Sequence, residues 1–338
     1  MEVYLTVDTE CTEERLVNGR IRPPVGYDLM MRGRFEGHRN GFGTDFLIRE
    51  LARYGFRATF FMEVLCSEHF GLEGLTSVCR DLQNAGQDLQ LHLHPNFRRP
   101  EWRANGGEAP ADNIGEFDLE TQISLLAAGI DILNRAGVPK DAIVAFRAGN
   151  YGASNLTWQA LKRVGLSIDS SFNLWGIGTE GWCLIDDGER NDLYEAIPGL
   201  WELPVSCFRE SHGFRHLEIT AISSSEMRHT LSQLHAAGTR AATIVLHPGE
   251  FFVIDDHEHH RGRPNTINIA RFRNLLRFLN GSRNRFQVRT VGALAAELRT
   301  AGLRRSDRPD AIPRGSHMRK LARLPVQAIK RTLMRPRN

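Results

Sequence analysis

Short runs rich in β-branched and other apolar residues recur along the whole chain, and longer segments with a different spacing separate them. Runs of this kind predict β-strands. They lie near 2–8, 57–62, 88–94, 142–147, 166–171, 200–206, 242–247 and 287–291. Between them, apolar residues recur about every 3.6 positions, which predicts amphipathic helices. These segments are 44–54, 71–84, 118–136, 154–164, 223–237, 267–280 and 291–301.

The alternation of predicted strands with predicted helices is typical of βα units that build a parallel sheet. Eight such strands over about 300 residues favour a closed (β/α) barrel over an open sheet. Ser223 and Glu226 predict a capping box, and Ser154 predicts another helix N-cap. We therefore expect an α/β fold of the TIM-like barrel class over residues 1–302, followed by a tail over 303–338.

Charge distinguishes the tail from the rest of the chain. Residues 303–338 hold eleven Lys and Arg against two Asp, a net charge of +9, and since the whole chain carries +3 the remainder carries −6. The body therefore gives no sign of a nucleic-acid partner. In the tail, apolar residues alternate with Arg and Lys, which fits either a basic helix on an anionic membrane surface or a disordered tail. These apolar residues are Leu321, Leu324, Val326, Ile329 and Leu333.

Two features concern the cellular compartment. The strand predicted at 2–8 follows Met1 at once, which leaves no room for a signal peptide, and no run reaches the ~18 apolar residues of a membrane span. The five cysteines are scattered without a C-x-x-C pair, which argues against a disulfide framework or a cysteine zinc site. We expect a cytoplasmic protein, with peripheral contact to the inner face of the membrane as the role of a basic tail helix.

Titratable side chains follow several predicted strands at their carboxyl ends, where parallel barrels assemble their active sites. Asp8 and Glu10 end the first strand and share one face if its two-residue period continues. His92 and His94 end the third strand in the same way, so both imidazoles can reach one metal ion. We expect these four side chains to face one site.

Arg147 and His247 follow two later strands of the same series. An Asp at a strand end often only forms a turn, a buried Arg often pairs with a carboxylate, and a lone His is often a core residue. The His92–His94 pair is harder to explain in this way, because neighbouring imidazoles on an apolar strand are costly to bury. Together the residues predict a metal site with acid–base groups beside it.

With these residues in place, the chain resembles the NodB-type polysaccharide deacetylases, carbohydrate esterase family 4, over roughly residues 1–300. The similarity consists of short motifs in the family's order. They are Thr6–Glu10, Arg57–Met62, Ala85–Pro95, Phe146–Gly149, Ile168–Ser171 and Val245–His247. Two features depart from the family pattern. Thr9 replaces the usual second Asp, and the histidines are spaced H-x-H instead of H-x-x-x-H.

The resemblance implies a distorted (β/α) barrel with a divalent metal ion, expected to be Zn²⁺, held by a carboxylate and two histidines. The expected ligands are Glu10, His92 and His94. Asp8 is expected to be the general base on the metal-bound water, with Arg147 holding it, and His247 the acid that protonates the leaving amine. The sequence leaves open whether Asp8 or Glu10 is the carboxylate ligand.

The implied function is that of a hydrolase of non-peptide carbon–nitrogen bonds, which removes an N-acetyl group from an amino sugar or glycan. Tyr151, Asp169 and Ser170 are expected to contact the substrate. Two alternatives stay open: an amidohydrolase for a non-sugar or cyclic amide, and a glycan-binding protein without turnover. The presence of base, ligands, arginine and acid in one chain favours an enzyme.

Overall fold

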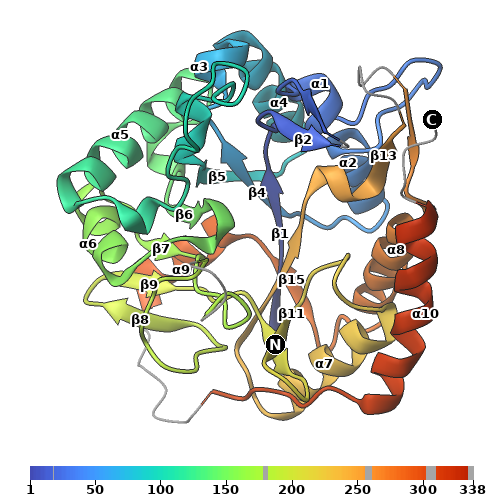
Figure 1. Ribbon diagram of the computed structural model, residues 1–338. Coiled ribbons are helices and arrows are strands. Elements are labelled where there is room, and N and C mark those ends of the chain that lie inside the picture. Colours follow the sequence, from blue (N-terminus) through green and yellow to red (C-terminus); the bar gives the residue numbers. More distant parts are fainter. Residues whose placement is uncertain (18, 178–181, 256–260, 302–309, 334–338) are drawn as a thin grey trace.

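The computed structural model describes residues 1–17, 19–177, 182–255, 261–301 and 310–333, and a curled, mainly parallel sheet lies at its centre (Figure 1). The strands of this sheet are β1 (Glu2–Thr9), β4 (Thr59–Glu63), β5 (Asp88–Leu93), β6 (Ala145–Ala148), β7 (Ile168–Asp169), β8 (Tyr194–Ile197), β9 (Leu200–Glu202), β12 (Ala241–Leu246) and β15 (Gln287–Arg289). Their order is β12-β1-β4-β5-β6-β7-β9-β8, and β15 pairs with the first residues of β1. Only β8 runs antiparallel to its neighbour in this sheet.

The two ends of the sheet are joined by irregular backbone. The N–H of Val205, just after β9, donates to the carbonyl of Phe172 at 2.9 Å, and the N–H of Ser206 donates to Thr243 of β12 at 3.2 Å. Farther along, Val245 of β12 donates to Leu217 at 2.9 Å. The sheet therefore curls round until its edges meet, which confirms the prediction of an α/β fold with a distorted barrel.

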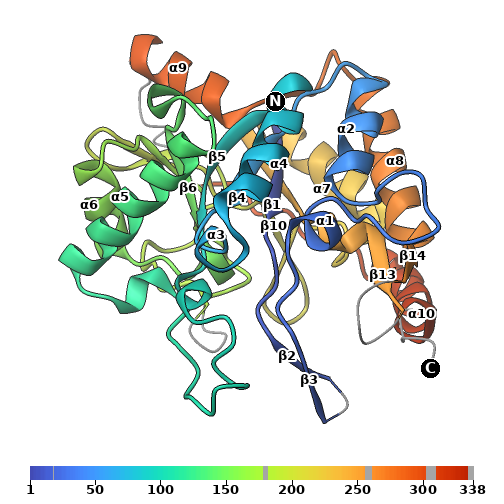
Figure 2. The same cartoon turned by 90° about the horizontal axis from the view of Figure 1, so that it is seen from above.

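Helices pack around the outside of the sheet (Figures 1 and 2). They are α1 (Tyr27–Met30), α2 (Thr44–Ala52), α3 (Ser67–Phe70), α4 (Leu72–Asn84), α5 (Leu119–Arg135), α6 (Asn155–Arg163), α7 (Ser224–Ala236), α8 (Thr266–Asn280) and α9 (Val291–Ala301). The predicted capping box of Ser223 and Glu226 is confirmed at the start of α7, and Ser154 is the N-cap of α6 as predicted, where it forms a capping box with Thr157. Every predicted strand and helix has a counterpart, with bounds that differ by a few residues.

Three hairpins were not predicted. They are formed by β2 (Arg15–Val17) with β3 (Arg20–Arg22), β10 (Cys207–Arg209) with β11 (Phe214–His216), and β13 (Phe252–Ile254) with β14 (Gly262–Pro264). Their strands have three residues each, too few to show a period. Short 3-10 helices were missed for the same reason. They are η1 (Pro95–Arg98), η2 (Ile114–Glu116), η3 (Lys140–Ala142), η4 (Gly149–Tyr151) and η5 (Pro248–Phe251).

The basic tail contains α10 (His317–Leu333), which lies along α7 and α8 (Figure 1). Arg323 fastens this helix, because its buried guanidinium donates to Glu210 at 2.6 Å and lies 3.4 Å from Glu226. Leu321 and Leu324 remain about half exposed, at 49% and 47%. The other apolar tail residues, Val326, Ile329 and Leu333, have side chains outside the described residues. The boundary at 302 and the membrane contact of the tail stay predictions.

Among the described residues, no helix combines the length and apolar character that a membrane crossing requires. The five cysteines, at positions 11, 66, 79, 183 and 207, are buried free thiols.

Candidate active site

A cavity of about 290 Å³ opens at the carboxyl ends of the central strands. Its lining residues come from β1, β5, β6, β11 and from the segments after β1, β5, β6, β7, β11 and β12. They are Asp8, Glu10, His92, His94, Ala148, Asn150, Tyr151, Trp175, Trp182, His216, Glu218 and His247. Parallel strands place their carboxyl ends at one mouth of a barrel, so the strand topology explains why these distant residues meet.

Glu10, His92 and His94 form the group that best fits a metal ion. Their nearest ligand atoms all lie within 4.8 Å of one another. The Oε2 atom of Glu10 is 2.8 Å from Nε2 of His94 and 3.6 Å from Nε2 of His92. The ring planes of the two histidines are nearly perpendicular, at 81°. Two imidazole nitrogens and one carboxylate oxygen facing a common point are a donor set that suits Zn²⁺.

Outer hydrogen bonds fix the orientation of both imidazoles. Nδ1 of His92 donates to the carbonyl of Arg147 at 2.7 Å, because β5 and β6 pair these residues directly. Nδ1 of His94 donates to the Asp112 carboxylate at 2.9 Å, and Asn150 holds the same carboxylate at 2.6 Å. Each ring therefore turns Nε2 toward Glu10, which is the arrangement that metal-binding histidines require.

Charge at this position favours a cation. Burial lowers the pKa of His94, but the carboxylates of Asp112 and Glu10 outweigh it and hold that pKa well above its usual range. Burial likewise raises the pKa of Glu10, yet His94 and His92 outweigh it and hold that pKa well below its usual range. A site in which carboxylates and imidazoles together stabilise a proton can also bind a divalent ion in place of that proton.

Gly149 allows His94 to occupy its place. A Cβ atom at this position would lie 2.5 Å from Nδ1 of His94, too close for any other side chain. The next two residues, Asn150 and Tyr151, have φ angles of 53° and 58°, which is rare for residues other than glycine. This tight turn after β6 brings Asn150 onto Asp112 and Tyr151 into the cavity.

Asp8 and Arg147 form a buried ion pair beside the candidate ligands. Nη1 of Arg147 donates to Oδ1 of Asp8 at 2.7 Å and to Thr6 at 2.9 Å. The same guanidinium donates to the carbonyl and hydroxyl of Ser170 at 3.0 and 2.8 Å, and it lies 4.4 Å from the ring of Phe61. Oδ2 of Asp8 lies 3.8 Å from Nε2 of His247, so the second oxygen faces the cavity.

Thr9 takes no part in this site. Its side chain is fully buried, and its hydroxyl donates to the carbonyl of Val7 at 3.1 Å. Asp8 and Glu10 lie on either side of it and both line the cavity, as the two-residue period predicted.

His247 follows β12 and has carboxylates around its imidazole. Its Nδ1 is 3.7 Å from Glu250 and 3.9 Å from Glu218. Burial lowers the pKa of His247, but Glu250 and Asp8 outweigh it and raise this pKa to about 10. Glu218 in turn accepts from His216 at 2.6 Å and from Thr220 at 2.8 Å. The imidazole is thus held in its protonated form with Nε2 toward Asp8.

The three residues expected at the substrate occupy different places. Tyr151 lines the cavity. Asp169 and Ser170 are fully buried and are not among the described residues that line it. Ser170 lies behind Arg147, and Asp169 accepts from Ser171 at 2.5 Å. Both residues therefore hold Arg147 and its strand in place. Their expected contact with the substrate stays a prediction.

The sequence did not single out the outer partners Asp112, His216, Glu218 and Glu250 as site residues. Asp112 lies in the long segment between β5 and α5, and long loops in compact domains are often functional. Glu250 is three residues beyond His247, where it accepts from the His247 N–H at 3.1 Å. His216 and Glu218 come from a hairpin with no periodic signal, so only the fold brings them to the cavity.

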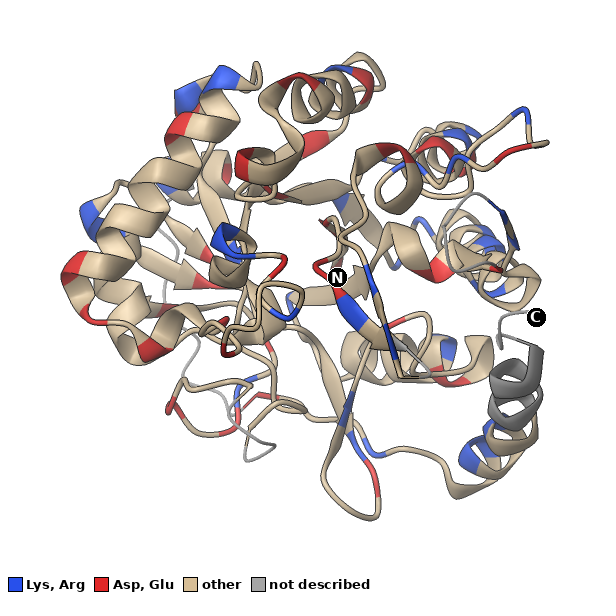
Figure 3. Ribbon diagram, turned by 45° about the horizontal axis from the view of Figure 1, so that its top comes forward, with Lys and Arg blue, Asp and Glu red and all other residues tan. Residues whose placement is uncertain are grey.

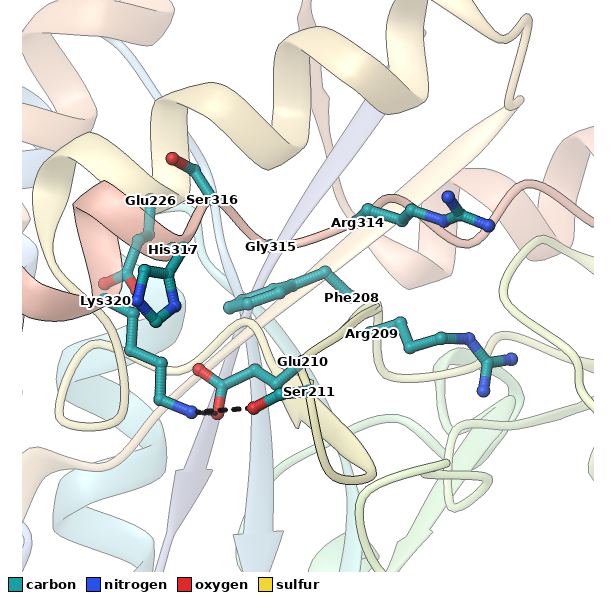
Figure 4. A pocket seen from close by; sticks show the side chains of 10 residues that line it. All are labelled: Phe208, Arg209, Glu210, Ser211, Glu226, Arg314, Gly315, Ser316, His317 and Lys320. Carbon is teal, nitrogen blue, oxygen red and sulfur yellow. Dashed lines mark hydrogen bonds and ion pairs between the residues drawn. The ribbon is translucent and has the colours of Figure 1, made fainter.

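A second cavity, of about 350 Å³, lies between hairpin β10–β11 and the start of α10 (Figure 4). Phe208 lies at its centre, and its charged side chains largely pair with one another. Lys320, for example, lies 3.5 Å from Glu210 and 3.3 Å from Ser211. Within the described residues, its histidine, His317, and its carboxylates do not form a group that could hold a metal ion, so it offers no comparable chemistry.

The choice of carboxylate ligand can be tested by substitution. Glu10→Gln is expected to weaken Zn²⁺ binding by more than roughly tenfold, because it removes the only negative charge among the three ligands. Loss of a partner that only hydrogen-bonds to a ligand already weakens metal binding by roughly tenfold. Thr9→Val is the matched control, since its hydroxyl points away from the site, and it should leave affinity unchanged. Titration against a competing chelator measures both. Unchanged affinity in Glu10→Gln would remove Glu10 from the ligand set.

Comparison with known proteins gives distant structural likenesses. No protein-family model and no curated protein sequence matches the chain. A Mycobacterium smegmatis protein assigned as a polysaccharide deacetylase has a TM-score of 0.49 and 20% identity, over 78% of this chain and 80% of its own. Peptidoglycan deacetylase PdaC from Bacillus subtilis has a TM-score of 0.40 and 11% identity, over 89% and 93%. The pseudoenzyme BA3943 of carbohydrate esterase family 4, from Bacillus anthracis, has a TM-score of 0.43 and 9% identity, over 87% and 65%.

These structures are of the kind that the sequence motifs resemble, and one of them is a pseudoenzyme. A function for this chain therefore has to be inferred from its own side chains.

Proposed function

We propose that the protein is a metal-dependent hydrolase that removes the N-acetyl group of an amino sugar. The observation that carries this proposal is the convergence of three kinds of group on one cavity. A ligand set (Glu10, His92 and His94), a carboxylate fixed by an arginine and a protonated imidazole all line it or lie directly behind it. Such a set can hydrolyse an amide, because the base takes a proton from water and the acid gives one to the poor amine leaving group.

Glu10, His92 and His94 would hold the ion, which we infer to be Zn²⁺ from two imidazoles and one carboxylate. A divalent ion bound there lowers the pKa of water toward about 7 and polarises an acyl oxygen. The remaining chemistry belongs to side chains of the protein.

Asp8 is the proposed base. Arg147 holds one of its oxygens at 2.7 Å and balances its charge, which leaves Oδ2 facing the cavity. This oxygen accepts the proton of the water that adds to the acyl carbon. Because Arg147 is fully buried and has four hydrogen bonds, the orientation of Asp8 is fixed before substrate arrives.

His247 is the proposed acid. Its pKa, raised to about 10 by Glu250 and Asp8 against the effect of burial, keeps the imidazole protonated at neutral pH. When the carbon–nitrogen bond breaks, the imidazolium gives its proton to the nitrogen, and acetate and a free amine leave. Nδ1 faces Glu218 and Glu250, so Nε2 is the donor that faces Asp8 and the cavity.

The rim of the cavity suits a sugar. Tyr151, Trp175 and Trp182 line it, and Trp175 packs against His216 with ring centroids 4.5 Å apart. Aromatic faces present an apolar surface to the C–H bonds of a pyranose while leaving its hydroxyls free. A volume of about 290 Å³ is at the lower end of the ~300–1,000 Å³ typical of ligand pockets, which favours one sugar unit in the site.

The proposal is tested by acetate release from a panel of N-acetylated amino sugars, nucleotide-linked sugars, lipid-linked sugars and cyclic amides. Protein loaded with Zn²⁺ should release acetate from at least one sugar. His92→Ala should lose both metal and activity, whereas His247→Gln should keep its metal and lose about 10²–10⁴-fold in kcat. Release of product from cyclic amides alone, or full activity in His247→Gln, would contradict the proposed function or the proposed acid.

A further inference from the structure

The hairpin formed by β2 and β3 projects from the face that carries the candidate active site (Figure 2). Its register pairs Arg15 with Arg22 and Leu16 with Ile21. Because side chains alternate along a strand, Leu16 and Ile21 share one face, and Arg15, Arg20 and Arg22 share the other. The hairpin is therefore an amphipathic ribbon with one apolar face and one basic face.

The apolar face of the ribbon is open to solvent. Leu16 is 57% exposed and Ile21 is 42% exposed, and they are direct cross-strand partners. An apolar pair normally stabilises a hairpin by packing against the protein body. Here the pair is exposed to solvent instead, which is the arrangement expected of a surface that meets a partner.

Of the three arginines, Arg15 lies near a carboxylate, that of Glu13, with which it interacts electrostatically. Arg15 and Arg20 are exposed, and Nε of Arg22 is buried without a hydrogen-bond partner. Figure 3 shows where Lys and Arg (blue) and Asp and Glu (red) lie along the chain. Arg15 and Arg22 oppose each other directly across the two strands. Like charges in this position repel each other, so the ribbon is destabilised until an anionic partner neutralises them.

The ribbon is attached firmly to the active site. It begins five residues after the proposed ligand Glu10, and Thr12 and Val25 close its base with backbone hydrogen bonds of 3.0 and 2.9 Å. The Glu14 carboxylate accepts from the backbone N–H groups of Arg103 and Ala104 in the loop that follows His94. Any surface that holds the ribbon therefore also fixes the position of the cavity mouth.

We propose that this ribbon docks the protein on an anionic membrane surface, and that the substrate is a lipid-linked N-acetylated amino sugar. The statement on substrate rests on the proposed function. A membrane interface offers both requirements of the ribbon, since anionic phosphates meet the arginines and the acyl boundary receives Leu16 and Ile21. A free polyanionic glycan would satisfy only the basic face.

A second copy of the chain fits this surface less well than a membrane does. Stable protein interfaces bury on the order of 1,200 Å² or more, and two three-residue strands with one exposed apolar pair offer far less. Binding to an anionic bilayer needs no such buried area, because each arginine and each inserted apolar side chain contributes its own share of the binding free energy.

The experiment is co-sedimentation of the full chain with vesicles of phosphatidylcholine containing phosphatidylglycerol, and with vesicles of phosphatidylcholine alone. Wild type should bind only the anionic vesicles. Replacing Arg15, Arg20 and Arg22 by Gln should weaken binding about 100-fold, since each arginine near an anionic surface contributes a factor of about five. Leu16→Ser with Ile21→Ser should weaken it about tenfold or more. Leu321→Ser with Leu324→Ser on α10 is the matched control and should bind as wild type does.

Three results would contradict the proposed docking surface. The wild-type protein could fail to bind anionic vesicles, or the ribbon variants could bind them as strongly as the wild type does. Loss of binding in the α10 variant alone would assign the membrane contact to the tail. Thermal unfolding confirms that each variant is folded, and size-exclusion chromatography at several concentrations detects self-association through the ribbon, which would assign it to a second copy. Sedimentation requires no turnover, so failure of docking is separate from failure of acetate release. Binding without turnover of lipid-linked sugars, when soluble sugars are turned over, would overturn the substrate class.

Discussion

Asp8→Asn is expected to lower kcat by about 10²–10⁴-fold while the protein keeps its metal. The amide oxygen of the new side chain can still accept from Arg147, which donates to Asp8 at 2.7 Å, so the geometry around the cavity is retained. The amide cannot take a proton from water, however, and the base is lost. Steady-state acetate release and elemental analysis of the same sample measure the two quantities together.

The matched control for this substitution is Asp118→Asn. Asp118 is a surface carboxylate whose task is to cap α5 by accepting from Thr121 at 2.8 Å, so its loss should leave kcat unchanged. If Asp8→Asn loses metal and activity in the same proportion, Asp8 is a metal ligand, and the proposed roles of Asp8 as base and Glu10 as ligand are wrong.

Arg147→Met is expected to lower the free energy of unfolding by about 3–5 kcal/mol. The guanidinium is fully buried, and its removal takes the nearest charge partner, at 2.7 Å, from the Asp8 carboxylate, which is itself only 2% exposed. The substitution also leaves the carbonyl and hydroxyl of Ser170 without their donor. Urea denaturation monitored by circular dichroism gives the free energy.

Arg163→Met is the control for the arginine substitution. Arg163 pairs with Glu120 at 2.8 Å, but both side chains are largely exposed, so the expected loss is about 0–1 kcal/mol. The double variant Asp8→Asn with Arg147→Met should recover part of the stability, because no buried charge then lacks a partner. Equal stability of Arg147→Met and Arg163→Met would show that the buried pair contributes no more than a surface pair.

Most of the barrel could be predicted from the sequence because its strands lie in runs rich in apolar residues and its helices are long enough to show their period. β1 and β12 are almost completely buried runs, and α5 and α8 repeat their apolar positions over several turns. The same period predicted which polar residues face the cavity. Asp8 and Glu10 lie two apart around a buried Thr9, and His92 and His94 lie two apart around Leu93.

The supporting groups of the site could not be predicted in this way. Asp112 reaches His94 from an irregular loop, and Glu218 reaches His247 from a segment after a three-residue strand. Neither segment has a period, and an isolated acidic residue in a loop is most often a solvated one. Their roles follow from which loops the closed sheet brings together, and that information is spread over the whole chain.

Arg147 also bears on how relatives of this protein are recognised. It joins two parts of the site, because its backbone carbonyl orients His92 while its guanidinium holds Asp8, Thr6 and Ser170. A descendant that lost His247 but kept Asp8 would still be stabilised by this arginine, because the buried carboxylate would otherwise lose its nearest charge partner. Arg147 in a new sequence thus indicates a buried Asp8, whereas His247, which a folded but inactive descendant can discard, is the position whose identity distinguishes an enzyme from an inactive relative.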